Sequence, residues 1–487
     1  MKKRLTPRLA LGLALLCLLA GRAAAQAEDK AARIDELMRA YHGFGQFNGA
    51  VLVAEGGRVV HKKGYGLANM EWNAPVEADT KFRLGSITKQ FTAVLVLQLV
   101  QEGKLKLDGR VTDYLPDYRK DTGSRVTVHH LLNHTSGIPS YTGLPNFFKD
   151  VSRDPYTVAD FVKTYASGDL EFEPGAKFNY NNSGYFLLGA IIERVTGKPY
   201  EAVLRERILD PLGMKDTGYD HHDTLIPKRA SGYARTPAGY VNAPYLDMSL
   251  PYAAGSLYST VEDLYLWDQA LYTDKVLPAA VRELMFKPGL ENYAYGWFAT
   301  KEPLAPGAPP VAAVGHGGGI NGFNTLIVRQ PETKNLVVLL NNTGGAPLDH
   351  ISRNIARILA GLPVEPPRQS VALALAKTAF ERGAAEAVKQ YRELKATQAD
   401  KFDFSEGELN TLGYQLLGAG RVGDAVEIFK LNVEAYPGAF NTYDSLGEAY
   451  AVQGEKELAI KNYRRSLELN PQNTNAVERL KKLEAKQ

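Results

Sequence analysis

The chain has 487 residues, which at roughly 150 residues per domain predicts about three domains, or one large unit and a small one. Apolar residues make up 45% and charged residues 23%, close to globular averages, which excludes a mainly disordered, collagen-like or multi-span membrane chain. With 57 basic and 54 acidic residues and no basic stripe, we expect no nucleic acid partner.

Residues 1–25 have the layout of a secretory signal peptide. A basic start is followed by an apolar run of 12 residues and by two overlapping Ala-x-Ala cleavage options that begin at Ala23 and Ala25. A membrane anchor would need about 20 apolar residues, so this run is too short. The single cysteine, Cys17, lies inside the segment, so a mature chain would have no disulfide. We expect a periplasmic or secreted protein without a membrane span after cleavage.

The segments that follow alternate between strand and helix patterns. Ala50–Lys63 predicts a β-hairpin, because two apolar stretches flank a Gly-Gly pair. Phe91–Val100 and Ser183–Val195 are apolar runs of helical length that end near a glycine. Two further strands are expected at Phe323–Arg329 and Leu336–Leu340. Strands early and late, with helical or irregular sequence between them, predict a sheet assembled from both ends of the domain around a helical insertion.

A proline-rich linker at residues 361–370 ends this domain, which we place at residues 28–360. Residues 371–487 are helical and contain a repeat of 34 residues, in which six positions recur: Leu412, Gly413, Gly420, Ala425, Phe429 and Pro437 match Leu446, Gly447, Gly454, Ala459, Tyr463 and Pro471. This pattern resembles tetratricopeptide repeats, of which ~3 are usually needed. Either Val371–Leu394 adds a degenerate pair of helices, or the array packs on the main domain.

Several familiar motifs are absent or misplaced. No Gly-x-Ser-x-Gly elbow, His-Glu-x-x-His or phosphate-binding loop occurs. Gly317-x-Gly319-x-x-Gly322 matches a dinucleotide fingerprint, but a strand pattern rather than a helix follows it. His130 and His134 have a metal-ligand spacing, yet no carboxylate or cysteine completes a site and a glycine soon ends the helix. We therefore expect neither a metal nor an organic cofactor.

Ser86-Ile87-Thr88-Lys89 is the only Ser-x-x-Lys in the chain. A serine at a helix start places its hydroxyl near the positive end of the helix dipole, and a lysine three residues later lies on the same face. A desolvated lysine can take the proton of the serine and so activate it as a nucleophile. The ordinary alternative is an N-cap serine followed by a solvated lysine.

Two further segments carry groups of chemical interest. Tyr180–Asn182 (Tyr-Asn-Asn) offers a phenol for proton transfer and an amide that can orient a substrate. Tyr240–Asn242 has the same spacing but lies in a stretch broken by proline and glycine. Gly315–Gly319 (Gly-His-Gly-Gly-Gly) permits close approach of backbone to a ligand, and its N–H groups can form half of an oxyanion hole. The ordinary alternative for either tyrosine segment is a surface turn, and for the glycine run it is a bulge or flexible turn.

Together and in this order, the three motifs resemble the serine β-lactamase and penicillin-binding-protein superfamily, particularly its class C-like and esterase branches. The resemblance covers Ile34 to about Ile358, and Leu131–Gly137, Pro211–Met214 and Ala253–Ser256 are similar to family signatures. It implies a β-lactamase/transpeptidase-like α/β (α+β) fold, with an antiparallel sheet flanked by helices and a helical insertion, followed here by an all-α repeat domain.

The resemblance also implies a role for each matching residue. Ser86 would be the acylated nucleophile, Lys89 its proton partner and Tyr180 the general base or acid. By the same resemblance the remaining members of the site are substrate-binding Asn182, His316 and Gly318, and an oxyanion hole formed by the backbone N–H groups of Ser86 and Gly319.

His316 is the main departure from the family pattern, because lactamases usually carry the lysine of Lys-Thr-Gly there. The Lys-x-Gly sequence at Lys62 lies before Ser86, and the one at Lys287 has a proline where a strand should line the site. A neutral histidine cannot pair with a substrate carboxylate as lysine does, although a protonated one partly could. We therefore expect inefficient hydrolysis of β-lactams.

These observations predict an exported serine hydrolase that acts through a Ser86 acyl-enzyme on esters, D-amino-acid peptides of the cell wall or β-lactams. Its partners would be a small-molecule or peptidoglycan-like substrate and, through the repeats, a protein. The alternative is a catalytically silent peptidoglycan-binding protein or a repeat-based adaptor. The complete set of Ser86, Lys89 and Tyr180 weighs against silence, whereas the repeats are compatible with both.

Overall fold

The computed structural model describes residues 28–236 and 239–484, so the expected signal segment lies outside the described residues. The chain divides into two compact units. The first contains the described residues up to Ala234 together with Asn242–Glu365, and the second contains Arg235–Val241 and the chain from Pro366 onward. Among the described helices, none has the length and apolar character needed to cross a bilayer.

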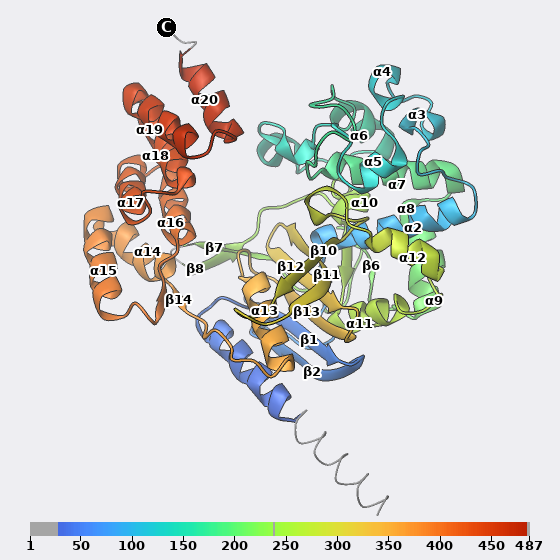
Figure 1. Ribbon diagram of the computed structural model, residues 1–487, viewed down its shortest axis with the longest axis horizontal. Coiled ribbons are helices and arrows are strands. Elements are labelled where there is room, and N and C mark those ends of the chain that lie inside the picture. Colours follow the sequence, from blue (N-terminus) through green and yellow to red (C-terminus); the bar gives the residue numbers. More distant parts are fainter. Residues whose placement is uncertain (1–27, 237–238, 485–487) are drawn as a thin grey trace, which may run out of the picture. The chain divides into compact units, whose positions relative to one another are not determined.

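A six-stranded antiparallel sheet lies at the centre of the first unit, in the order β10-β11-β12-β13-β1-β2 (Figure 1). Its strands are β1 (Gly49–Glu55), β2 (Arg58–Tyr65), β10 (Phe298–Pro303), β11 (Pro310–Ile320), β12 (Phe323–Gln330) and β13 (Asn335–Asn341). β1 pairs with β13, with Gly49 opposite Asn341. The predicted early hairpin and the two late strands are thus confirmed, and the two ends of the domain meet inside one sheet.

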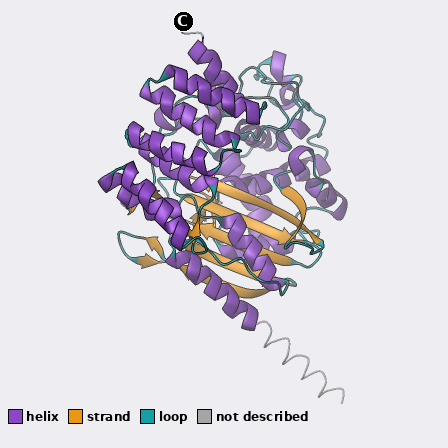
Figure 2. Cartoon of the chain, turned by 60° about the vertical axis from the view of Figure 1, so that its left-hand side comes forward, coloured by secondary structure: helices purple, strands orange, loops and turns teal. Residues whose placement is uncertain are grey.

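Helices cover both faces of this sheet. Successive side chains of a strand point to opposite faces, and in β1 both sets are apolar, so each face must be covered. Val51 and Val53 pack with the helix at residues 28–43 and with α13 (Leu348–Leu359). Ala50 and Leu52 belong to the core on the other face, which the insertion helices complete. Figure 2 shows the strands side by side in orange, with purple helices against them.

The insertion between β2 and β10 consists mainly of helices. The larger elements are α2 (Thr88–Gln101), α5 (Val128–Leu132), α6 (Val158–Tyr165), α7 (Asn182–Thr196), α8 (Tyr200–Leu204), α10 (Tyr252–Gly255), α11 (Val261–Ala270) and α12 (Ala279–Phe286). Short strands interrupt it: β3 (Leu67–Asn69), β4 (Ala74–Pro75), β5 (Phe82–Arg83), β6 (Gly218–Tyr219), β7 (Tyr233–Thr236), β8 (Gly239–Asn242) and β9 (Leu257–Ser259). The insertion is therefore helical with small sheets added, as the broad pattern predicted.

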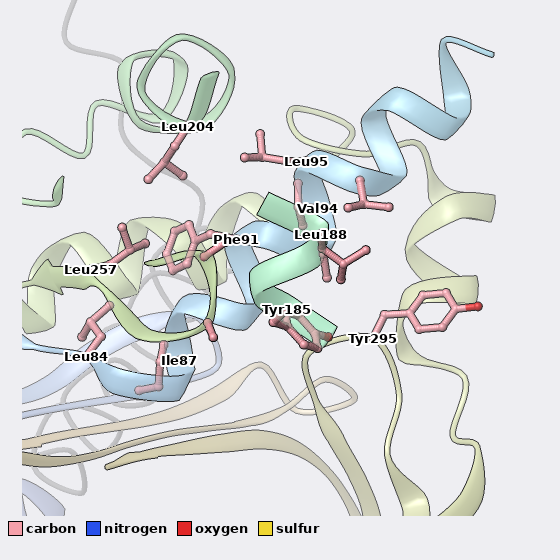
Figure 3. Packing of buried hydrophobic residues seen from close by; sticks show 14 of the residues in the cluster. Leu84, Ile87, Phe91, Val94, Leu95, Tyr185, Leu188, Leu204, Leu257 and Tyr295 are labelled. Atoms are coloured by element: carbon pink, nitrogen blue, oxygen red, sulfur yellow. The ribbon is translucent and has the colours of Figure 1, made fainter. Parts of the chain in front are cut away.

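The two helices predicted from apolar runs, α2 and α7, pack against each other in the core. Figure 3 shows Phe91 and Leu95 of α2 among the same buried cluster as Tyr185 and Leu188 of α7. Gly197 ends α7 in the left-handed conformation, with φ of +69°. α2 is buried from Thr88 to Leu97, so the polar side chains of its first turns, including Lys89, lie inside the protein.

The glycine-rich run is not the bulge or flexible turn that was its ordinary alternative, because Gly315–Gly319 lies within β11 and pairs with β12. The reason is a close backbone approach. A Cβ atom on Gly318 would lie 1.9 Å from the Leu84 carbonyl oxygen, and one on Gly85 would lie 2.9 Å from the same strand's backbone. Glycine is thus required where β11 passes the segment that leads to Ser86.

The second unit is built from helix pairs with a core of their own. Its helices are α14 (Val371–Arg382), α15 (Ala384–Thr397), α16 (Glu406–Gly418), α17 (Val422–Ala435), α18 (Phe440–Gln453), α19 (Lys456–Leu469) and α20 (Thr474–Glu484). The pair α16 and α17 recurs as α18 and α19, which matches the repeated sequence. A side chain on Gly413 would meet the Phe429 ring at 2.5 Å, and one on Gly447 would approach the Tyr463 ring at 3.2 Å. Each recurring glycine therefore makes room for the recurring aromatic ring of the next helix.

Candidate active site

Ser86 lies in the short 3₁₀ turn η1 (Gly85–Ile87) directly before α2. Gly85 has φ of +56°, a conformation that favours glycine. The serine is partly exposed and lines a cavity of about 450 Å³. No side-chain cap bond is made at the start of η1 or of α2, so the interpretation of Ser86 as an ordinary N-cap is wrong.

Lys89 is fully buried on α2, which rules out the solvated lysine of the ordinary alternative. Its Nζ atom lies 3.1 Å from Ser86 Oγ, 2.8 Å from Asn182 Oδ1 and 2.8 Å from the Ala254 carbonyl oxygen. Burial lowers the pKa of Lys89 well below its usual value. Of its three partners, only the Ser86 hydroxyl carries a proton to donate. The lone pair of a neutral Lys89 amine is therefore directed at Ser86.

Tyr180 and Asn182 come from the start of α7, where Asn181 caps the helix by accepting from the Gly184 N–H. The Tyr180 hydroxyl is buried and lies near that of Ser86 without an aligned hydrogen bond to a described residue. Burial raises the pKa of Tyr180 above its usual value, so its hydroxyl stays protonated. Asn182 donates from Nδ2 to Thr142 Oγ1 at 3.0 Å, so both ends of its amide have protein partners.

His134 supports this segment, a role that the sequence reasoning missed. The Asn181 N–H donates to Nδ1 of His134 at 3.1 Å, and the His134 and Tyr180 rings lie 4.3 Å apart between centroids. Burial lowers the pKa of His134 well below its usual value. Its proton therefore stays on Nε2, and the ring remains neutral. The signal that could have found this residue is the signature segment Leu131–Gly137, in which His134 is central.

His316 is buried and neutral. Its Nδ1 lies 2.5 Å from the Gly317 carbonyl oxygen, which can only accept, so the ring proton is on Nδ1. Nε2 then accepts from the Tyr293 hydroxyl at 3.1 Å. Burial lowers the pKa of His316 to about 3. The ring lies 6.0 Å from that of Tyr180 but is not among the described residues that line the cavity.

The glycines of β11 have different surroundings. Gly318 is buried against the Leu84 carbonyl and does not line the cavity in the described part of the chain, whereas Gly319 does line it. A Cβ atom on Gly319 would meet no atom within 4 Å. The Gly319 N atom lies beside Gly85, next to the turn that carries Ser86. This position suits an oxyanion hole formed with the Ser86 N–H.

The structure leaves other sequence candidates outside this site. Tyr240–Asn242 forms the exposed strand β8. Lys62 makes an ion pair with Glu262 at 2.5 Å on the surface. Across residues 28–236 and 239–484, no three His, Cys, Asp or Glu side chains lie together in a way that could hold a metal ion.

Comparisons with known proteins agree with this arrangement. The sequence profile of the family described as Beta-lactamase matches residues 33–362. Penicillin-binding protein 4* of Bacillus subtilis (strain 168) is 32% identical over 326 residues, which cover 61% of this chain and 68% of that protein. Esterase EstB of Burkholderia gladioli is 30% identical over 339 residues, covering 61% of this chain and 86% of the esterase.

Solved structures show the same likeness. The D-amino acid amidase from Ochrobactrum anthropi SV3, complexed with L-phenylalanine amide, superposes with a TM-score of 0.60 at 27% identity. The superposition covers 68% of this chain and 99% of the amidase chain. The family match ends before Pro366, so the helix pairs of the second unit lie outside it.

Proposed function

The chain belongs to the Beta-lactamase family of serine hydrolases, and from this premise we propose that it hydrolyses esters or amides through an acyl-enzyme on Ser86. The observation that carries the proposal is the fully buried Lys89, whose Nζ atom lies 3.1 Å from Ser86 Oγ. The hydrogen-bond partners of its Nζ atom are a hydroxyl, an amide oxygen and a backbone carbonyl, so no described carboxylate holds Lys89 in the charged form.

Acylation follows from these positions. Neutral Lys89 accepts the Ser86 proton as Oγ attacks the carbonyl carbon of the substrate. The developing oxyanion is stabilised by the backbone N–H groups of Ser86 and Gly319. Tyr180 donates its proton to the leaving alcohol or amine, and the proton on Lys89 then passes to Tyr180. In deacylation water attacks the acyl carbon and gives a proton to Tyr180, which passes its own proton to Lys89. Lys89 returns a proton to Ser86 Oγ as the acyl bond breaks, so the acid is released and Ser86 is restored.

The proposed substrates are esters and amides, including D-amino-acid peptides, with β-lactams as poor substrates. The names of an esterase and a D-amino acid amidase among the relatives support the first two. The neutral His316 in place of lysine argues against a substrate whose binding depends on a carboxylate. The alternative of a silent binding protein is less favoured, because burial of a lysine amine without a carboxylate partner is costly and binding alone does not require it.

We further propose that residues 371–487 are tetratricopeptide-like repeats that bind a protein partner, and that residues 1–25 direct export. The 34-residue spacing of the helix pairs supports the first proposal, and the basic, apolar and small-residue order supports the second. The N-terminus of the chain recovered from expressing cells tests export, since cleavage would leave a new terminus near Ala25.

Covalent labelling tests the acyl-enzyme. The full chain is treated with a fluorophosphonate, and the labelled peptide is identified by mass spectrometry. We expect the label on Ser86, and we expect Ser86→Ala to remove it and to lower turnover of an activated ester by several orders of magnitude. Ser136 and Ser183 are internal controls. A label on either serine, or a label that persists in the Ser86→Ala variant, overturns the assignment.

A further inference from the structure

The cavity beside Ser86 has an unusual lack of charge. It is about 450 Å³ in volume, and its lining contains no Asp, Glu, Lys, Arg or His among the described residues. This size lies within the ~300–1,000 Å³ of typical small-molecule pockets. Lys89 and His316 are buried and are not among the described residues of the lining, and burial lowers the pKa of each. A carboxylate that entered the cavity would lose water without gaining a cation.

One wall of the cavity is aromatic and aliphatic. Phe147 and Phe148 begin the π-helical turn η3 (Phe147–Val151), and Leu246 and Leu250 face the same cavity from the segment before α10. Phe147 is 2% exposed, and its ring meets that of Phe148 edge to face at 5.3 Å. Phe148 itself is 58% exposed. The lip of the cavity therefore presents an apolar ring that a ligand can cover.

Two asparagines of the lining, Asn321 and Asn324, make hydrogen bonds to the protein. Asn324 donates from Nδ2 to the Ala346 carbonyl at 2.9 Å and accepts at Oδ1 from Asn341 at 2.6 Å. Asn321 donates to the Pro244 carbonyl at 2.8 Å. Each amide is thus bonded to the protein, and neither side chain brings a positive charge to the cavity lining.

The positions of the proposed catalytic groups decide which part of the substrate occupies the cavity. Tyr180, the proposed proton donor to the leaving group, does not line the cavity in the described chain, whereas Ser86 and Gly319 do. The leaving group therefore departs on the Tyr180 side, and the cavity holds the group that stays bonded to Ser86.

We propose that the acyl group of the substrate is uncharged and apolar, aromatic or branched, and that Phe148 is a specificity-determining residue for it. This inference rests on the proposed acyl-enzyme at Ser86. Contact with the Phe148 ring removes apolar surface of the ring and of the acyl group from water, which stabilises the complex. Only an acyl group long enough to reach the lip of the cavity can make this contact.

A series of p-nitrophenyl esters tests the inference, because the leaving group stays constant while the acyl group changes. We expect kcat/KM for the phenylacetyl ester to exceed that for the acetyl ester by about tenfold or more. The methyl succinyl ester should be turned over faster than the hemisuccinyl ester, which has nearly the same shape but carries a carboxylate.

Variants of the full chain locate the effect. Phe148→Ala should lower the phenylacetyl-to-acetyl ratio several-fold, whereas Trp72→Ala should leave it unchanged. Trp72 is a suitable control because it is 83% exposed and does not line the cavity. Phe148→Lys should raise the relative turnover of the hemisuccinyl ester, because it places a cation at the lip. As Phe148 is mostly exposed, these variants should keep the fold.

The outcomes separate this inference from the proposed function. Suppose that Ser86 takes the fluorophosphonate label but kcat/KM is the same for all acyl groups, or is higher for the hemisuccinyl ester than for the methyl succinyl ester. The acyl-group inference is then overturned, whereas the proposed acyl-enzyme stands. The inference is also overturned if kcat/KM varies with the alcohol part of the ester and not with its acyl group. Absence of both label and turnover overturns the two together.

Discussion

The Tyr293 hydroxyl donates a hydrogen bond to Nε2 of His316 at 3.1 Å, and both side chains are buried. Nδ1 of the same ring is held by the Gly317 carbonyl. His316 therefore has a partner on each nitrogen and is fixed as the neutral tautomer. The resemblance to lactamases predicts the lysine of Lys-Thr-Gly at this position, and this protein has a hydrogen-bonded ring there instead.

Replacement of this ring should change substrate choice. We expect the parent protein to turn over an uncharged activated ester better than a cephalosporin, and His316→Lys to shift the ratio of kcat/KM towards the cephalosporin. The added ammonium can pair with the substrate carboxylate, although the shift is modest if the pair is solvent-exposed, where such pairs contribute ~0–1 kcal/mol. A parent preference for the cephalosporin, or an unchanged ratio in the variant, would contradict the charge argument.

Stability should fall in mild acid because of the buried histidines. The folded pKa values of His134 and His316 lie below the ordinary value of 6.5, so the unfolded chain binds more protons in that range. The free energy of unfolding is then lost as pH falls below 6.5, by up to about 1.4 kcal/mol per pH unit for each fully neutral ring. For His316 this window extends down to about pH 3.

Urea unfolding at pH 7, 6 and 5 measures this effect in the first unit, because all three tryptophans of the chain lie there. His316→Phe removes one of the histidines whose folded pKa is lowered by burial and should flatten the dependence of stability on pH. Equal slopes for the parent and the variant would show that the His316 ring becomes protonated in the folded protein.

Gly318 and Gly319 form a matched pair for separating packing from catalysis. Gly318→Ala would place Cβ 1.9 Å from the Leu84 carbonyl oxygen. We therefore expect the free energy of unfolding to fall by about 1–3 kcal/mol and the activity to be lost as well. Gly319→Ala meets no atom within 4 Å and should keep its stability, but its methyl group projects into open space beside the cavity and should lower kcat/KM. Denaturation and ester turnover of both variants check this. A stable, fully active Gly318→Ala protein would contradict the packing argument.

Removal of the helix pairs should leave the chemistry intact. A chain that ends near Pro366 retains every proposed catalytic residue and both hydrophobic clusters of the first unit. We expect it to fold, to take the fluorophosphonate label on Ser86 and to hydrolyse a small ester at a rate close to that of the full chain. A soluble and folded but inert fragment would mean that the second unit completes the active site.

Much of the fold was predictable because it depends on local patterns. The Gly-Gly hairpin, the apolar runs of α2 and α7, and the strands β12 and β13 each follow from periodicity and breakers within a dozen residues or so. The spacing of Ser86 and Lys89 likewise needs only one helical turn. The 34-residue repeat predicted the helix pairs, since a recurring glycine and a recurring aromatic ring must pack together in every copy.

Tertiary structure alone decided the state and surroundings of the site. The pKa of Lys89 depends on burial by several elements, and burial belongs to the assembled core rather than to a motif. His134 meets Tyr180, and Tyr293 meets His316, across chain separations that no local pattern encodes. The sequence left two alternatives open for the glycines of β11, because their neighbour, the Leu84 carbonyl, comes from a distant part of the chain. Residue type and spacing thus determined which groups are present, whereas packing determined which of them meet, which lose water and therefore which can carry a charge.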